Sequence, residues 1–218
     1  MTVLEEPVSL REQVSVAVRS ALVAGQMNPG QVYSVPTLAT RFEVSATPVR
    51  EALLDLTKEG LLEPVRNKGF RVVVLSEQQL DDVYRIREML EVPSIADVMA
   101  IATRRDYATL RQSARKIVSC ANESDLIGYL TADREFHLGM LGLTGNQRLV
   151  DVVGSLRSHV RLFGLTPLVA SGQLGASAKE HTQLASLMAK GDVSGASTLM
   201  RRHLGHTRGT WAGREEAQ

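Results

Sequence analysis

Apolar residues recur with a helical period through the N-terminal part of the chain, and turn residues interrupt the pattern twice. Ser9 and Glu12 have the spacing of a capping box, so a first helix is expected to start there and to end near Gly25. A second helix is expected after Ser34 and a third after Ser45, because serine accepts hydrogen bonds from the free N–H groups at a helix start. Two short helices joined by a tight turn predict a helix-turn-helix.

A short β-hairpin is expected directly after these helices. Residues 61–65 and 70–74 are apolar and β-branched segments, and the turn between them contains Gly69. A hairpin in this position is typical of a wing. Residues 1–75 are therefore predicted to form a winged helix-turn-helix domain of three helices and a hairpin.

From residue 76 onward the pattern is helical only. Ser76 and Gln79 provide another cap signal, at the head of a long helix. Breaks are expected at residues 104–106, 122–124, 144–146, 166–177 and 191–192. They divide residues 76–218 into about six helices, so the predicted fold class is mainly α, with an all-α antiparallel helical bundle after the winged domain.

Composition supports this class. Hydrophobic residues make up 44% of the 218 residues and aromatic residues only 4%, which favours helices packed on helices. No apolar run reaches the roughly 20 residues that a membrane-spanning helix needs. The acidic N-terminal segment does not resemble a secretory signal, and the single Cys120 excludes an internal disulfide or a thiolate cluster. The predicted location is the cytoplasm.

Net charge alone does not indicate nucleic-acid binding, because it is only +1. The prediction of double-stranded DNA as a partner depends on the helix-turn-helix geometry, which places Thr47 and Arg50 in the major groove. Arg41, in the second helix, is a candidate phosphate contact. At the wing tip, the candidate DNA contacts are Lys68, Gly69 and Arg71.

Four polar residues lie where helical stripes call for apolar ones. Asp133 and His137 are four residues apart and share the inner face of one helix, while His181 and His203 lie on two later stripes. Burying such groups is costly unless they satisfy one another or bind a cation. An aspartate with three imidazoles suits Zn²⁺ first, and Ni, Mn or Fe as alternatives. Each histidine alone could instead donate a hydrogen bond to a backbone carbonyl.

Other polar residues also lie near the inner stripes. Spacing does not exclude His159 or His206 as further ligands. Arg87 lies on the inner stripe of the long helix, where a guanidinium needs an anion. That anion is either an acid such as Glu91 or Glu135, or the carboxylate of a bound effector. Arg161 is a second candidate for the effector.

The first seventy-odd residues resemble the DNA-binding domain of the GntR regulator family. The resemblance covers residues 9–74 and is carried by the segments VSATPVREAL, EGLL and NKGFRV, which start at Val44, Glu59 and Asn67. One position departs from the family pattern, which usually has arginine where this chain has Ala46. Base reading is therefore expected to depend more on Thr47, on apolar contact from Ala46 and on DNA shape.

Residues 78–208 resemble the FCD ligand-binding domain of the FadR-type branch of that family. The segments that carry the resemblance are VYRIREMLE, DREFH, GN, EH, GD and MRRHL, in chain order from Val83 to Leu204. The resemblance implies that Asp133, His137, His181 and His203 hold a metal ion, and it assigns no ligand role to His159 or His206. It also implies a small carboxylate effector.

The predicted function is a ligand-responsive, homodimeric transcription regulator, in this family usually a repressor, that binds a palindromic operator. Its domains are residues 1–75, which bind DNA, and residues 76–218, which bind metal and ligand and form the dimer. Two alternatives are kept: a metal-ion sensor without an organic effector, and a metal-dependent hydrolase. No hydrolytic motif such as His-Glu-x-x-His is present, which argues against the hydrolase.

Overall fold

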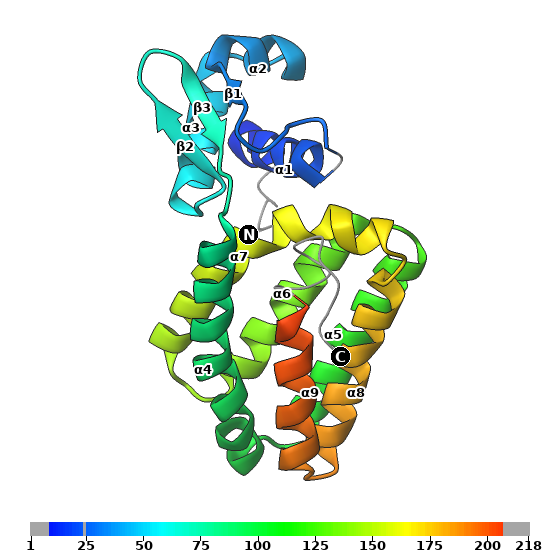
Figure 1. The fold of residues 1–218 in the computed structure, drawn as a ribbon. Coiled ribbons are helices and arrows are strands. Elements are labelled where there is room, and N and C mark those ends of the chain that lie inside the picture. Colours follow the sequence, from blue (N-terminus) through cyan, green and yellow to red (C-terminus); the bar gives the residue numbers. More distant parts are fainter. Residues whose placement is uncertain (1–8, 24, 207–218) are drawn as a thin grey trace, which may run out of the picture. The chain divides into compact units, whose positions relative to one another are not determined.

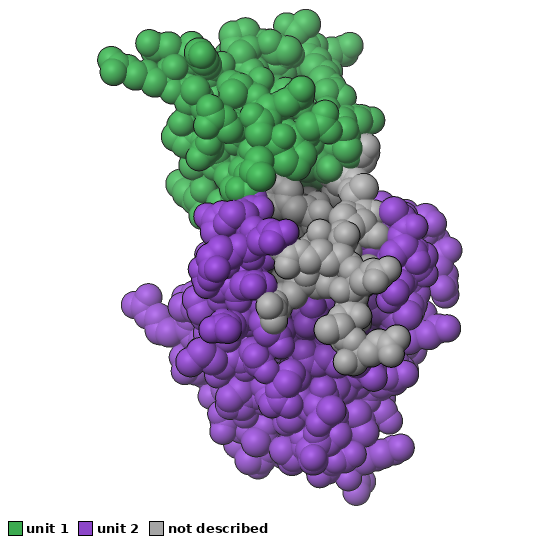
Figure 2. Space-filling view, in the orientation of Figure 1, with its two compact units in different colours: residues 1–74 green, residues 75–218 purple. Residues whose placement is uncertain are grey.

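The computed structural model describes residues 9–23 and 25–206, without the side chains of residues 23, 159–164 and 166–167. The chain divides into two compact units, residues 1–74 and 75–218 (Figure 2). None of the helices in the described ranges is both long and apolar enough to cross a membrane.

The first unit is a small helical domain with a three-stranded sheet (Figure 1). Its elements are α1 (Leu10–Val23), β1 (Val32–Tyr33), α2 (Val35–Phe42), α3 (Ala46–Lys58), β2 (Leu62–Val65) and β3 (Gly69–Val72). The Ser34 hydroxyl accepts a hydrogen bond from the backbone N–H of Thr37 and so caps α2. Ser45 holds the N-cap position of α3, but its side chain makes no capping hydrogen bond.

The sheet contains one strand more than the hairpin expected from the sequence. The strand order is β1-β3-β2 and both pairs are antiparallel, with Tyr33 opposite Phe70. A two-residue strand is too short to produce a recognisable alternation, which is why the pattern did not reveal β1. Its effect is seen at Gly69, where φ is +129° and a Cβ would collide with the Tyr33 carbonyl oxygen. Only glycine fits here.

The second unit consists of six helices in its described part. They are α4 (Glu77–Ile101), α5 (Arg104–Asn122), α6 (Leu126–Gly142), α7 (Gln147–Ala170), α8 (Leu174–Ala189) and α9 (Val193–Gly205). Figure 1 shows α9 between α4 and α8, and α5 packs against α6 and α8. The predicted fold class, mainly α with a winged domain before a helical bundle, is confirmed.

Most helix boundaries agree with the signals in the sequence. Ser76 and Gln79 form the expected capping box of α4. The break expected over residues 166–177 is wrong in extent, because α7 continues to Ala170 and α8 begins at Leu174. Leu165 and Leu168 are buried, and this packing outweighs the weak helix preference of the Gly- and Ser-rich composition that suggested a loop.

Candidate metal centre and nucleic-acid interface

Helix α6 places the first two metal-site candidates in the core of the second unit. Asp133 and His137 are one helical turn apart and both are 0% exposed. The same helix face carries Tyr129, Phe136 and Met140, which are also fully buried. The apolar side chains therefore pack this face against the other helices, and this packing also buries Asp133 and His137.

The structure brings the other two candidates to the same place. His181 of α8 and His203 of α9 are 1% and 7% exposed, and the four side chains offer ligand atoms that all lie within 4.8 Å of one another. His181 Nε2 lies 3.0 Å from Asp133 Oδ1 and 3.2 Å from His137 Nε2. The His203 ring stacks on that of His137, with 5.2 Å between the centroids.

Each imidazole has a second neighbour at its Nδ1 atom. His181 Nδ1 lies 3.1 Å from the Ser177 carbonyl oxygen, and His203 Nδ1 lies 2.9 Å from Glu180 Oε2. His137 Nδ1 lies 3.3 Å from Glu91 Oε2, without the geometry of a hydrogen bond. In His181 and His203, an Nδ1 held by such an acceptor leaves Nε2 as the nitrogen that can bind an ion.

The donor set fits a divalent transition metal. Two ligands about 2.0–2.1 Å from one ion in tetrahedral geometry lie roughly 3.3 Å apart. The separations of 3.0 and 3.2 Å that join His181 to Asp133 and His137 are close to this value. One carboxylate with three imidazoles is also a donor set that zinc and its neighbours bind.

The protonation states suit metal binding. Burial lowers the pKa of His203 to about 4, and burial together with the nearby Arg157 lowers the pKa of His137 well below its ordinary value. Both imidazoles are therefore neutral at pH 7, and neutral imidazole is the form that donates a lone pair to a metal.

A buried ion network lies directly beside the four residues. Arg87 Nε donates to Glu91 Oε1 at 2.7 Å, and Arg157 Nη1 lies 3.0 Å from Glu91 Oε2. Arg157 also forms a short ion pair with Asp133 through Nη2. Burial would raise the pKa of Glu91, but the guanidinium groups of Arg87 and Arg157 outweigh it and hold the pKa well below its ordinary value.

The network shows which of the two candidate acids pairs with Arg87. Glu91 is its partner, whereas Glu135 lies 3.2 Å from Lys116 on the surface. The side chain of Arg161, the second effector candidate, lies outside the described residues, as does that of His159. The other histidine outside the predicted set, His206, donates to Glu180 Oε2 at 2.9 Å.

Sequence reasoning missed Arg157, although a signal for it exists. It is 2% exposed and lies on the inner face of α7 with Val153, Leu165 and Leu168, at helical spacing. Glu180 was also missed as part of the site. It is 8% exposed and lies one turn before the buried Leu184.

In the first unit, the predicted DNA contacts lie at the start of α3 and along the wing. Ala46, Thr47 and Arg50 are exposed on α3, and Lys68 is exposed in the turn between β2 and β3. Two candidates already have protein partners: Arg41 donates to Gln26 Oε1 at 2.8 Å, and Arg71 donates to Glu63 at 2.8 Å.

A helix-turn-helix with a wing, followed by a helical bundle, is typical of a DNA-binding transcription regulator. Comparison with known families agrees. Residues 10–72 match the bacterial regulatory proteins of the gntR family, and residues 82–206 match the FCD domain. The chain therefore belongs to the GntR family, in the FadR-type branch that carries an FCD domain.

Its relatives are transcription regulators and not enzymes. The chain is 34% identical to the Nta operon transcriptional regulator of Aminobacter aminovorans over 64% of its own length and 66% of the relative's, just under two thirds of that protein. It is 27% identical to the repressor GlaR of Escherichia coli over 85% of its own length and 88% of the relative's. The solved structure of E. coli McbR/YncC superimposes with a TM-score of 0.71 at 25% identity, covering 91% of this chain and 94% of that one.

Proposed function

We propose that this regulator is a cytoplasmic repressor whose helical unit binds a divalent transition metal, Zn²⁺ in the first place, and a small organic acid as effector. The observation that carries the proposal is the convergence of Asp133, His137, His181 and His203 in an apolar core. Ni, Mn and Fe remain alternative metals because the same donors bind them. When bound, the ion supplies an electrophilic centre to which a carboxylate oxygen can coordinate.

Charge balance supports an anionic effector. In the network beside the centre, Arg87 and Arg157 are matched by Glu91 and Asp133, and the buried imidazoles of His137 and His203 are neutral at pH 7. A divalent cation would leave an excess of positive charge in the core, and uncompensated buried charge is costly. A small organic acid would offset this charge. Among the residues that the structure describes, Arg87 and Arg157 are the cations that would bind the acid. Arg161 remains a prediction from the sequence.

The same network favours a second candidate function, a sensor of the metal itself. Arg87 already has its anion in Glu91, so its burial does not require an organic ligand. In that case metal binding alone would change the affinity for DNA.

For the first unit we propose that Thr47 and Arg50, with Ala46, read bases in the major groove, and that Lys68, Gly69 and Arg71 approach the backbone at the wing. Arg41 would contact a phosphate by exchanging its hydrogen bond to Gln26 for one to DNA. Apart from the half-buried Gly69, these residues are exposed, which supports the assignments because their side chains can reach DNA without unfolding.

A homodimer would present two such units to a palindromic operator. Helix α4 supports dimerisation because its outer face carries an exposed apolar stripe with alternating spacings of three and four residues. The stripe consists of Ile86, Met89, Pro93, Ala96 and Ala100. Met89 is 74% exposed, which is costly for a large apolar side chain unless a second copy covers it.

The proposal is tested by thermal unfolding of the full-length protein with a panel of mono-, di- and tricarboxylates, before and after metal is removed by a chelator. Elemental analysis should find about one ion per chain as purified, the count expected for one four-ligand site. A carboxylate at 100 times its Kd should stabilise the metal-loaded protein by about 2.7 kcal/mol, and the chelated protein much less.

The two candidate functions give different outcomes. If the protein binds metal and its operator affinity depends on that metal, but no carboxylate changes its thermal unfolding, the function is that of a metal sensor. A chain that takes up no metal would contradict both.

A further inference from the structure

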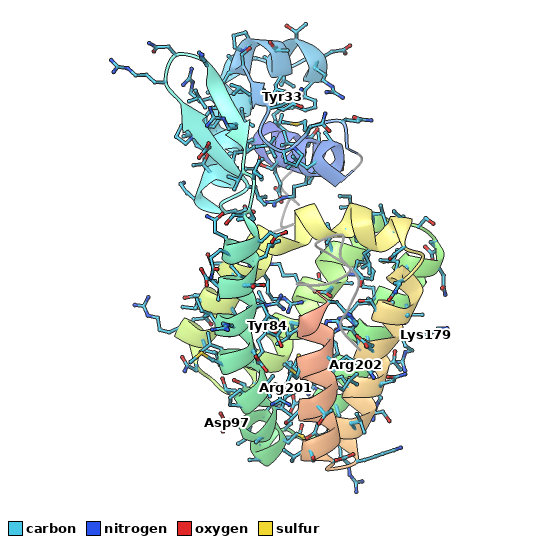
Figure 3. All side chains as sticks on the ribbon, in the orientation of Figure 1. Tyr33, Tyr84, Asp97, Lys179, Arg201 and Arg202 are labelled. Atoms are coloured by element: carbon cyan, nitrogen blue, oxygen red, sulfur yellow. The ribbon has the colours of Figure 1, made fainter. Side chains whose placement is uncertain are left out.

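Glu180 of α8 is a buried carboxylate on which Arg202 and His203 of α9 and the C-cap residue His206 converge. Its Oε2 atom lies 2.9 Å from His203 Nδ1 and 2.9 Å from His206 Nε2, and its Oε1 atom accepts from Arg202 Nε at 3.1 Å. The Glu180 side chain is 11% exposed. In Figure 3 Arg202 is labelled on the α8 side of α9, whereas Arg201 is labelled on the α4 side, where it pairs with Glu88.

A carboxylate that accepts a hydrogen bond from one imidazole nitrogen fixes the tautomer and the orientation of the ring. The proton stays on Nδ1, and the lone pair is left on Nε2. Such partners also raise the basicity of a histidine ligand. His181 obtains its own restraint from the Ser177 carbonyl within its own helix, whereas the only such contact that the described residues show for His203 reaches across from α8 to α9.

We propose that Glu180 is a positioning residue for the metal centre, holding the His203 imidazole so that Nε2 faces the ion while Nδ1 donates to the carboxylate. The inference rests on the proposed function, because it requires that Asp133, His137, His181 and His203 bind a metal. Glu180 itself does not touch the ion. It acts through His203 and joins the end of α9 to α8 at the point where the fourth ligand enters the core.

Glu180, His203 and His206 also lie close enough to form a second cation site. Two features favour the positioning role over that reading. Both histidines approach the same carboxylate oxygen at hydrogen-bond distance, and the guanidinium of Arg202 already neutralises the carboxylate. A second divalent ion would have to displace these contacts and lie beside a fixed positive charge.

The test is the affinity of the full-length Glu180→Gln variant for Zn²⁺, measured by competition with a chromophoric chelator. Glutamine keeps the shape and a neutral acceptor but removes the charge. The expected result is a 10- to 100-fold weaker affinity, the usual effect of removing such a partner, with the stoichiometry unchanged. The Co²⁺-loaded variant should keep the absorption of the same four ligands.

Two control variants separate positioning from general effects on α9. Glu88→Gln removes the ion pair of Arg201 on the other side of the helix and should leave Zn²⁺ affinity unchanged. Arg202→Gln removes the third contact of Glu180 but keeps the bond to His203, so it should change the affinity by less than Glu180→Gln does.

Several results would overturn the inference. Wild-type affinity in Glu180→Gln, with metal lost in His203→Ala, would show that Glu180 does not position the ligand, while the proposed metal site would stand. If the wild type binds two metal ions per chain and Glu180→Gln binds only one, Glu180 would be a ligand of a second cation site. If Glu180→Gln does not fold, Glu180→Ala, which removes the acceptor of His203 Nδ1, is measured instead, and undiminished affinity there would be equally decisive. A wild-type chain without metal would instead contradict the proposed function itself.

Discussion

At the scale of single residues, the centre of the helical unit depends on a few charges that have no access to water. Arg157 is the cation that bridges the two buried acids Glu91 and Asp133. Because Asp133 is also a candidate metal ligand, Arg157 connects the ion network to the metal site. The most conspicuous residue in the DNA-binding unit is Arg50, the one basic side chain near the start of α3.

Replacing Arg157 with methionine should lower the free energy of unfolding by about 3–5 kcal/mol, because both acids would lose a buried partner. Urea unfolding followed by circular dichroism measures this. Arg201→Met removes the exposed pair with Glu88 and should cost only about 0–1 kcal/mol. Equal losses in the two variants would show that the network is hydrated and contributes little.

Arg50→Ala should weaken specific operator binding by about 1–3 kcal/mol, while the protein stays folded. Fluorescence anisotropy on an operator selected from random DNA measures the affinity. Lys58→Ala changes an exposed lysine in the last turn of the same helix and should have little effect. Unchanged specificity in Arg50→Ala would mean that α3 does not read the site.

At the scale of elements, capping residues fix where helices begin. Thr103 and Asp106 form a capping box at the start of α5, in which each side chain accepts from the other residue's backbone N–H. The Thr103 hydroxyl also donates to Asp106 Oδ2 at 2.6 Å, and this hydrogen bond, together with the one from the Thr103 backbone N–H, lowers the pKa of Asp106 below its ordinary value. The turn signals in the sequence predicted the break at residues 104–106 but not this box.

The lowered pKa of Asp106 predicts a dependence on pH. A carboxylate whose pKa is lower in the folded state stabilises the fold fully above its unfolded pKa, and this contribution is lost as the pH falls through the folded value. Asp106→Asn should therefore be less stable than wild type at pH 7, and the difference in Tm should shrink below about pH 4.

The exposed Asp97 of α4 offers a control for this experiment. Asp97→Asn should leave Tm nearly unchanged at both pH values. A Tm difference between wild type and Asp106→Asn that stays constant from pH 7 to pH 3 would contradict the capping argument.

The outer face of α4 predicts the oligomeric state. Met89→Glu should convert the proposed dimer to a monomer, because a buried unpaired charge in an apolar interface costs several kcal/mol. Sedimentation velocity distinguishes the two species. Val193→Glu places the same charge at an exposed apolar residue of α9 and should leave the dimer intact. A Met89→Glu variant that remains dimeric would move the interface elsewhere.

At the scale of the whole molecule, the proposal requires that ligand binding in one unit changes DNA binding in the other. Such coupling is reciprocal: if an effector weakens operator binding by some factor, the operator weakens effector binding by the same factor. Factors of about 5–150 are typical.

This reciprocity can be measured on the metal-loaded protein. The effector Kd, determined by titration calorimetry with and without saturating operator, should change by the same factor as the operator Kd determined with and without effector. His181→Ala should abolish the coupling together with metal binding. An effector that binds tightly but leaves the operator Kd unchanged would be a ligand without a regulatory role.

Local signals in the sequence determined most of the helix boundaries and both regions of interest. Serine caps and the stripe period placed α2, α3 and α4, and the conflict between polar side chains and apolar stripes singled out Asp133, His137, His181 and His203. Such features are readable because a cap or a stripe involves residues only a few positions apart. They also predicted that Arg87 needs an anion.

Contacts between distant segments were decided only by the tertiary structure. The pairing of β1 with β3, the bridge from Arg157 to Asp133 and the contact of Glu180 with His203 have no local pattern. The physical reason is that a helical stripe predicts which side chains face the core but not which helix they contact there. Buried charges must find partners, and which partners they find depends on how the helices pack.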